Sequence, residues 1–257
     1  MPAFKFNSLD EFMDGAGYII NGQWYPRVTS IVGIKAKPAL LYYYAQAANF
    51  AQAQEMTTKS ATEGTLVHNA IEAILKGEQP KVDSLIAPTV NAFHDFAQFH
   101  EIKPLTGGIE KRIWSPKHRF AGTIDILAEI NGVFGILDVK TSSGIWRDYG
   151  LQTSAYMGAL QEDDAWENLE RKQVVTRWIL RLDQQQVCLK CGAKRRTKGG
   201  NEKIRDNHNG CNHEWSETRG EWEFKELPDF KNDYEAFLAA KRLWEWENEF
   251  WLKKLGY

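Results

Sequence analysis

The chain has 257 residues, which is enough for one large domain or two small ones. Hydrophobic residues make up 43% and charged residues 26% of it, and no apolar run approaches the roughly 18–20 residues that a membrane span needs, so we expect no membrane partner. The formal net charge of −2 excludes a uniformly cationic DNA-binding protein, so any surface for nucleic acid has to be a local patch.

Turn and capping residues mark the elements expected in the N-terminal half. Asn21 and Gly22 form a two-residue turn signal between apolar runs. Pro38 suits the first turn of a helix, and Ser60 with Glu63 matches a capping box. With the spacing of the apolar residues, these signals predict a β-hairpin over residues 18–33 and helices over 38–58, 60–76 and 88–101.

The second half alternates between strands and helices. We expect a strand-rich block over 108–141, a helix over 147–162, strands over 174–182 and 221–227, and a final helix over 230–254. This order predicts a single α/β domain over 1–257, with a mixed central sheet flanked by helices and a helical N-terminal region. Residues 183–220 are polar and rich in Gly, Lys, Arg and Asn, so we expect them to form an insert within a hairpin.

A pair of aspartates carries the clearest chemical signal. Asn131 followed by glycine predicts a second two-residue hairpin turn. Counting outward from this turn places Asp125 directly opposite Asp138, on the same face of the two strands, with Cβ atoms about 4.5–5.5 Å apart. Lys140 is two residues beyond Asp138 and therefore shares that face.

Two facing carboxylates destabilise a sheet unless something compensates their charge. A divalent cation does so, and oxygen ligands at this spacing suit Mg²⁺ or Mn²⁺. Such a metal polarises a phosphoryl oxygen and lowers the pKa of a bound water, while Lys140 orients that water or stabilises charge on the phosphate. The pattern favours phosphodiester hydrolysis; the alternative is an exposed strand pair with scattered polar residues.

Four short motifs extend this signal. They are Glu63-Gly-Thr-Leu-Val-His68, Gly122-Thr-Ile-Asp125, Leu137-Asp138-Val139-Lys140 and Gln152-Thr-Ser-Ala-Tyr156. In this order, over roughly residues 60–160, they resemble the RecB-like branch of the PD-(D/E)XK nuclease superfamily, and the flanking segments are similar to phage-type exonucleases. One departure is that Ile124 replaces the proline that gives the superfamily its name.

The resemblance implies a restriction-endonuclease-like core with a metal centre. Asp125 and Asp138 would hold catalytic Mg²⁺ or Mn²⁺ through their carboxylates, and the carbonyl of Val139 would complete part of the shell. His68 would be a further ligand that favours Mn²⁺, although a lone histidine on a helix is more often structural. Glu110 matches an acidic position of the branch, and a solvated strand charge is the alternative.

The same resemblance implies residues around the metal. Gln152 and Tyr156 lie four apart on one helix face and would contact DNA or position Lys140, with an ordinary amphipathic helix as the alternative. Thr141 and Ser142 follow the catalytic strand and could donate hydrogen bonds to phosphate, although loops commonly contain such residues.

The insert carries a second metal signal. Cys188 and Cys191 form a C-x-x-C-G turn, and Cys211 with His213 supplies the other half of a Cys₃His zinc site. His208 is an alternative fourth ligand, and free thiols in a loop are the alternative to a metal. Some relatives carry an iron–sulfur cluster on four cysteines, which these three do not match. The insert is too polar to fold by core burial alone, which favours structural Zn²⁺ in a small zinc-knuckle-like fold.

A run of cations in the insert, Lys194, Arg195, Arg196 and Lys198, is the best candidate DNA-binding patch. We therefore expect a deoxyribonuclease, acting as an exonuclease on duplex ends or single-stranded DNA in recombination or repair. The clustered, odd cysteine set and the absence of a signal peptide at Met1–Asp10 predict the cytoplasm, or the host cytoplasm if a phage encodes the chain. A structure-specific endonuclease and a non-catalytic DNA-binding module on a nuclease fold are the alternatives.

Overall fold

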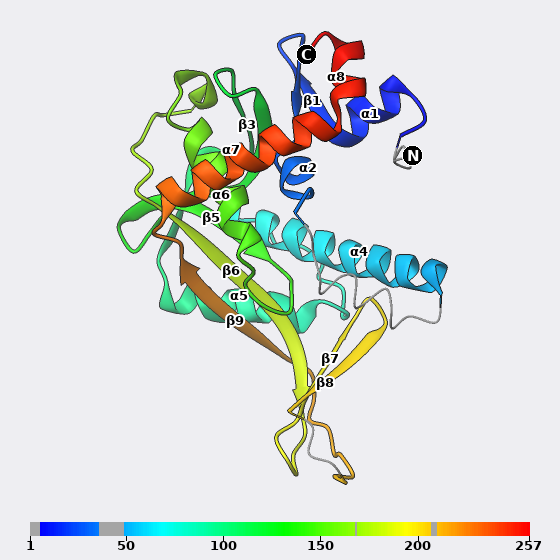
Figure 1. Ribbon diagram of the computed structural model, residues 1–257. Coiled ribbons are helices and arrows are strands. Elements are labelled where there is room, and N and C mark those ends of the chain that lie inside the picture. The colour runs from blue at the N-terminus through cyan, green and yellow to red at the C-terminus, as the bar shows by residue number, and fades with distance from the viewer. Residues whose placement is uncertain (1–5, 36–48, 168, 207–209) are drawn as a thin grey trace.

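The computed structural model describes residues 6–35, 49–167, 169–206 and 210–257 (Figure 1). Its centre is a seven-stranded sheet in the order β3-β4-β5-β6-β7-β8, with β9 paired to β6. The strands are β3 (Ile102–Ser115), β4 (Phe120–Ile130), β5 (Val133–Lys140), β6 (Thr176–Val187), β7 (Lys194–Lys198), β8 (Asn201–Arg205) and β9 (Arg219–Glu226). β5 and β6 are parallel and the other pairs are antiparallel, so the expected mixed sheet is confirmed.

Helices cover both faces of this sheet. They include α2 (Val28–Val32), α4 (Phe50–Leu75), α5 (Ala87–Phe99), α6 (Asp148–Ala159) and α7 (Phe230–Glu247), with a 3₁₀ turn η1 (Asp163–Trp166). Side chains of α2, α6 and α7 pack in one hydrophobic cluster with Ile136 of β5, whereas α4 and α5 pack in another with Leu137 and Val139. Because successive strand residues point to opposite faces, the two clusters lie on opposite sides of β5.

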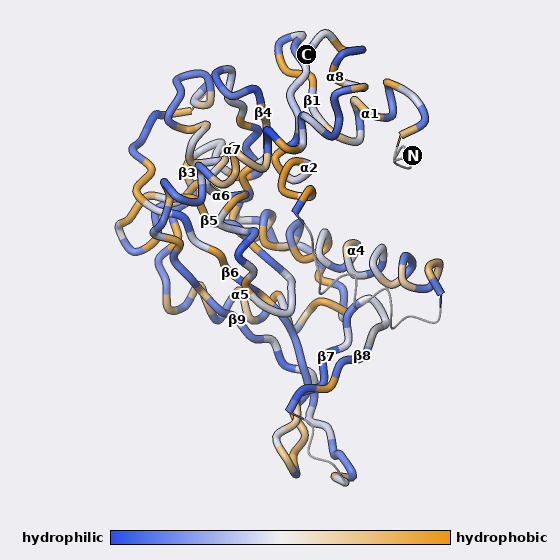
Figure 2. The backbone as a smooth tube through the Cα atoms, in the orientation of Figure 1, coloured by the Kyte–Doolittle hydropathy of each residue, from blue (hydrophilic) through white to orange (hydrophobic). Residues whose placement is uncertain are grey.

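The predicted N-terminal hairpin is only half correct. After α1 (Leu9–Ala16), the strands β1 (Gly17–Ile20) and β2 (Gln23–Pro26) pair around the predicted turn, where Asn21 and Gly22 both have positive φ. The following residues form α2, and a strand over 28–33 is wrong. Val28, Ile31 and Val32 are all buried, and this spacing fits one face of a helix. Figure 2 shows the α2 segment as mostly hydrophobic.

The expected break between two early helices is also wrong. Residues 38–48 lie outside the described part of the chain, but α4 runs without interruption through Ser60. Its N-cap is Asn49, whose side chain accepts a hydrogen bond from the backbone of Gln52 at 2.8 Å. No glycine or proline stands between Phe50 and Glu63 to end the helix. The Glu63 carboxylate does not cap a helix at Ser60 but accepts a hydrogen bond from the Gly199 N–H.

The later elements agree with their predictions, apart from a break in the last helix. Asn248 separates α7 from α8 (Glu249–Leu255), and its side-chain amide donates to the Trp244 carbonyl at 2.8 Å, in competition with helical bonding. The insert does interrupt two antiparallel strands, but it is shorter than the expected 183–220, because β6 continues to Val187 and β9 begins at Arg219; β7 and β8 within it were not predicted. None of the helices within the described ranges is long and apolar enough to cross a membrane.

Candidate active site and metal centres

The two aspartates stand where β4 and β5 separate. The predicted register is confirmed over five pairs, from Ile130↔Val133 to Ile126↔Leu137, and the pairing stops one step before Asp125 and Asp138. Here the Asp125 carboxylate accepts a hydrogen bond from the backbone N–H of Val139 at 2.8 Å. The Asp125 side chain therefore takes the Val139 N–H in place of a backbone carbonyl of β4, and β4 and β5 separate at this point.

Asp125 belongs to a cluster that could hold a metal ion. The ligand atoms of His68, Glu110 and Asp125 all lie within 4.8 Å of one another. His68 Nδ1 is 3.6 Å from the nearer Asp125 oxygen, and the histidine also hydrogen-bonds to the backbone of Val139. A small pocket opens at this cluster, lined by His68, Ile71, Glu72, Ile109, Glu110, Asp125, Ile126 and Val139. The cluster brings α4, β3 and β4 together, with β5 contributing backbone.

Glu110 takes an unusual conformation at this site. It has φ 50° within β3, in the left-handed region, at a cost of roughly 1–3 kcal/mol for a non-glycine residue. The pairs Ile109↔Ile126 and Lys111↔Ile124 on either side of it would set Glu110 opposite Asp125. The distortion therefore occurs where the Glu110 carboxylate would face that of Asp125. Strained backbone conformations of this kind are common at functional sites.

The electrostatics of the cluster favour a cation. Partial burial of the carboxyl, with the charges of Asp125 and Glu72 adding to it, raises the pKa of Glu110 to about 7, although the residue as a whole is exposed. Burial also raises the pKa of Asp125, although Lys140 opposes the shift. Burial and the Lys140 charge lower the pKa of His68, so its imidazole is neutral and available as a ligand at pH 7. A divalent ion would compensate the excess of carboxylate charge.

Asp138 lies beside this cluster but is held by other partners. Lys140 Nζ is 2.5 Å from Oδ2 of Asp138, and Gln152 Nε2 donates to Oδ1 at 3.2 Å and lies 2.9 Å from the Tyr156 hydroxyl. Burial raises the pKa of Asp138 to about 6 despite Lys140. The structure thus brings together the predicted residues of β5 and α6, namely Asp138, Lys140, Gln152 and Tyr156. Asp138 is not part of the metal-ligand group that His68, Glu110 and Asp125 form among the described residues.

Two motif residues position this arrangement. Burial lowers the pKa of Lys140, but the charges of Asp138 and Asp125 outweigh it and raise that pKa above its usual value, so the amine stays protonated. Gly122 allows Tyr156 to pack on β4, because a Cβ there would come 2.5 Å from the Tyr156 ring. The glycine of the Gly-Thr-Ile-Asp motif therefore has a packing role.

The expected DNA-binding residues are partly engaged inside the protein. The Thr141 carbonyl accepts from the side chains of Lys198 and Arg196, and the Ser142 hydroxyl donates to the Gly144 carbonyl at 2.7 Å. Thr141 and Ser142 thus stabilise the loop after β5 in this structure.

The cations of β7 differ in how much they are exposed. Arg196 Nε lies 2.6 Å from Asp183, and Arg195 donates to Gln186 at 2.8 Å while its guanidinium lies over the Trp215 ring. Lys194 is exposed, so it remains the β7 cation best placed to meet a phosphate.

The three cysteines and His213 form a second group that could bind a metal ion. All four ligand atoms lie within 4.8 Å of one another, with Cys188 Sγ 4.0 Å from Cys211 Sγ and Cys191 Sγ 3.4 Å from His213 Nδ1. Although burial raises the pKa of Cys188, hydrogen bonds from His213 and the backbone of Cys191 lower it to about 5, so it is a thiolate at neutral pH. The alternative ligand His208 lies outside the described residues.

Glu72 is a site residue that the sequence reasoning missed. It lies one helical turn after His68 on α4, lines the pocket, and its charge adds to the raised pKa of Glu110. Its carboxylate pairs with Lys76 at 2.5 Å. The spacing of four residues from His68 was the available signal, since residues i and i+4 share a helix face.

These shifts predict how the stability of the metal-free protein depends on pH. The folded protein binds protons at Asp138 (pKa about 6) and Glu110 (pKa about 7) more tightly than the unfolded chain, whose carboxyls titrate near pH 4. The contribution of these two carboxyls to stability should therefore fall as pH rises from about 4 to about 8, whereas His68, whose pKa is lowered, acts in the opposite direction as pH rises toward 6.5. Unfolding in chelator at pH 5.5 and 8 measures this, and Glu110→Gln should flatten the dependence; an equal slope in that variant contradicts the assignment.

A scan against protein-family models gives no match, and a search of curated proteins finds no similar sequence. The function therefore has to be inferred from the residues and their geometry.

Proposed function

We propose that this chain is a metal-dependent deoxyribonuclease built on a PD-(D/E)XK core. The observation that carries the proposal is the site where β4 and β5 separate: the carboxylates of Asp125 and Glu110, together with the imidazole of His68, lie within 4.8 Å of one another. The protonated amine of Lys140 and the buried carboxylate of Asp138 lie beside them. These are the charges that hydrolysis of a phosphodiester requires.

Each residue has a chemical role in this proposal. His68, Glu110 and Asp125 hold Mg²⁺ or Mn²⁺ together with the carbonyl of Val139, and Asp138 adds a carboxylate beside them. The bound ion supplies Lewis acidity toward a phosphoryl oxygen and lowers the pKa of a coordinated water. The Lys140 ammonium donates to the phosphate or to the attacking water, where negative charge develops.

Two residues of α6 support this chemistry. Gln152 donates to Asp138 and lies beside the Tyr156 hydroxyl, so it fixes the Asp138 carboxylate that in turn holds Lys140. A lysine whose position is fixed before the substrate arrives loses little entropy in the transition state. Of the two roles expected for Gln152 and Tyr156, we propose the positioning of Lys140, because the Tyr156 side chain is buried and therefore not placed to contact DNA.

Cleavage should require a divalent metal. Incubation of end-labelled linear DNA with the protein should give no product in EDTA, and activity should return with Mg²⁺ or Mn²⁺. Mn²⁺ should support it at lower concentration, because imidazole is a better ligand for Mn²⁺ than for Mg²⁺. Undiminished cleavage in the chelator would falsify the mechanism.

The same assay identifies the substrate. We propose an exonuclease, which should degrade linear duplex or single-stranded DNA and leave a covalently closed circle intact. Rapid cutting of the circle would favour a structure-specific endonuclease instead. DNA binding without cleavage of any substrate at either metal would favour a non-catalytic module on a nuclease fold.

We also propose that the Cys₃His group holds one structural zinc. Thiolates suit Zn²⁺ and the oxygen-rich catalytic group suits hard cations, so the two sites should differ in the metal they bind. The Cys-x-x-Cys turn is closed by hydrogen bonds from the Gly192 N–H to the Cys188 carbonyl and from the Cys188 N–H to the Ala193 carbonyl, at 2.9 and 2.7 Å.

Cys188→Ser should release this zinc and loosen the insert while the sheet stays folded, because β6 and β9 pair independently of the knuckle. Elemental analysis should give about one zinc per wild-type chain and a much smaller content in the variant. A zinc content near zero in wild-type protein whose insert resists proteolysis would refute the site. If the insert's cations bind DNA, the variant should also show weaker binding and a shallower salt dependence.

A further inference from the structure

The β7–β8 hairpin is attached to the helix that carries His68. At its turn, the Gly199 N–H donates to the Glu63 carboxylate of α4 at 2.8 Å. The backbone approaches closely: a Cβ on Gly199 would come 2.4 Å from the Met56 carbonyl, and its φ of 62° also favours glycine. The hairpin turn is therefore fixed to α4 five residues before His68.

The same hairpin holds the loop that follows Lys140. Lys198 and Arg196 both donate to the Thr141 carbonyl, Arg196 at 3.2 Å. Arg205 of β8 lies 3.4 Å from the Ser143 carbonyl. Arg196 is itself held by Asp183 of β6, and both side chains are nearly buried, with exposed fractions of 17% and 8%. Side chains of the β7–β8 hairpin thus bind two backbone carbonyls of the loop, those of Thr141 and Ser143.

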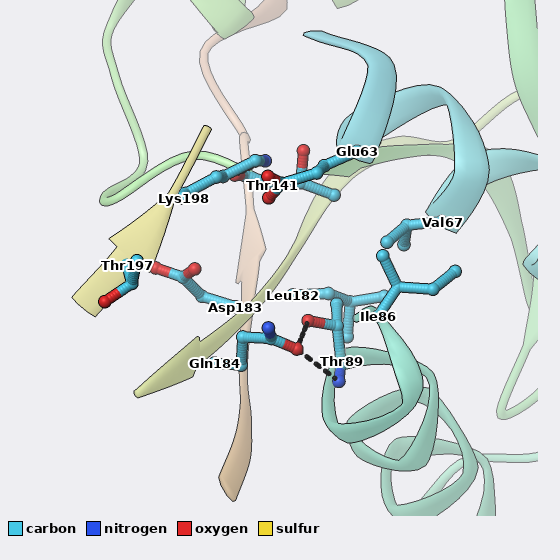
Figure 3. A pocket seen from close by; sticks show the side chains of 10 residues that line it. All are labelled: Glu63, Val67, Ile86, Thr89, Thr141, Leu182, Asp183, Gln184, Thr197 and Lys198. Atoms are coloured by element: carbon cyan, nitrogen blue, oxygen red, sulfur yellow. Dashed lines mark hydrogen bonds between the residues drawn. The ribbon is translucent and has the colours of Figure 1, made fainter. Parts of the chain in front are cut away.

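Figure 3 shows Lys198, Thr141 and Glu63 together at one side of a small pocket between α4, β6 and the hairpin. Burial and the Arg196 charge lower the pKa of Lys198 to about 8. Burying an amine is unfavourable unless its hydrogen bonds compensate, and the Thr141 carbonyl is its hydrogen-bond acceptor. On the other side of Thr141, a Cβ on Gly64 would come 3.0 Å from the Thr141 hydroxyl, so α4 and the loop are already in contact.

We infer that the β7–β8 hairpin fixes the position of α4 relative to the loop after β5, and that Lys198 and Arg196 are positioning residues for the catalytic site. His68 belongs to α4, and Lys140 ends β5 directly before this loop, so a shift of α4 relative to the loop would separate the metal ligand from the lysine. The inference rests on the proposed function. It also explains why Arg196 and Lys198 point inward to a backbone carbonyl instead of outward to a substrate.

Lys198→Met tests the inference, because it keeps the length of the side chain and removes the donor. We expect kcat to fall by at least about tenfold, since a small misplacement near the chemistry is costly, with the KM for DNA within about twofold. Mn²⁺ affinity, measured by calorimetry, should weaken, and amide hydrogen exchange over residues 141–144 should accelerate. Lys198→Arg, which restores a donor, should recover most of each property.

Lys190→Met is the matched control. It removes the same charge from the same insert, but its side chain is exposed and pairs with exposed Glu214 at 3.5 Å instead of the Thr141 carbonyl, so it should behave as wild type. Equal losses in both variants, or a rise in KM without a change in kcat, would show that Lys198 only attracts DNA. Unchanged exchange and Mn²⁺ affinity in Lys198→Met would overturn the inference whether or not the protein cleaves DNA. Faster exchange and weaker Mn²⁺ binding, in a protein that never cleaves DNA, would uphold the inference and refute the proposed function.

Discussion

Lys140→Met is expected to reduce kcat by about 10²–10³-fold, because removing one preorganised donor to developing charge costs this much in other hydrolytic sites. The KM for DNA should change little, since the ammonium acts mainly in the transition state. Its side chain is 17% exposed and its amine contacts the Asp138 carboxylate. Steady-state kinetics on linear DNA with saturating Mn²⁺ measure both parameters.

The fold should survive this substitution. Asp138 loses its ion-pair partner, but burial already raises its pKa to about 6, so the acid can take up a proton and keep its bond to Gln152. Lys225→Met, on the exposed edge of β9, is a matched control and should retain wild-type kinetics. Near-normal kcat in Lys140→Met would show that another residue performs the chemistry.

Local signals in the sequence predicted the register of the β4–β5 hairpin well. The turn after Ile130 set the register of β4 and β5, because a two-residue loop leaves a single pairing for the strands that it joins. What it could not predict was the separation of the strands one step beyond Ile126. That separation depends on the Asp125 side chain taking the Val139 N–H and on α4 bringing His68 beside it, and both are contacts between distant segments.

In the insert, the sequence predicts the metal ligands but not the direction in which the cations point. Its candidate metal group follows from the spacing of the three cysteines and His213 and from the polarity of the insert, which predict four ligands close together. Its cations were expected to face DNA, whereas Arg196 and Lys198 bond to the Thr141 carbonyl. A charge run in a sequence does not reveal whether its side chains point to solvent or to buried acceptors. That depends on the β7–β8 hairpin, whose docking on α4 has no local signal.

Asp125→Asn should separate stability from function most clearly. The side chain keeps an oxygen that can accept from the Val139 N–H, but it loses the charge that faces Glu110 and Asp138. In chelator the variant should be as stable as wild type or melt higher, by about 2–4 °C if roughly 1 kcal/mol of repulsion is relieved. Its cleavage activity should be lost.

The increase in melting temperature caused by Mn²⁺ should be smaller in Asp125→Asn than in wild type. At a Mn²⁺ concentration 100 times Kd, binding to the folded state stabilises wild type by about 2.7 kcal/mol, or roughly 5–10 °C in a chain of this size. Asp125→Asn should show almost none of this shift, because changes in residues that merely support a ligand already weaken metal binding by about 10–100-fold. Differential scanning calorimetry with and without Mn²⁺ measures both effects, and Asp95→Asn, an exposed acid on α5, serves as the control. An undiminished Mn²⁺ shift in Asp125→Asn would place the metal elsewhere, whereas a lower melting temperature in chelator would mean that the Asp125 charge stabilises the fold.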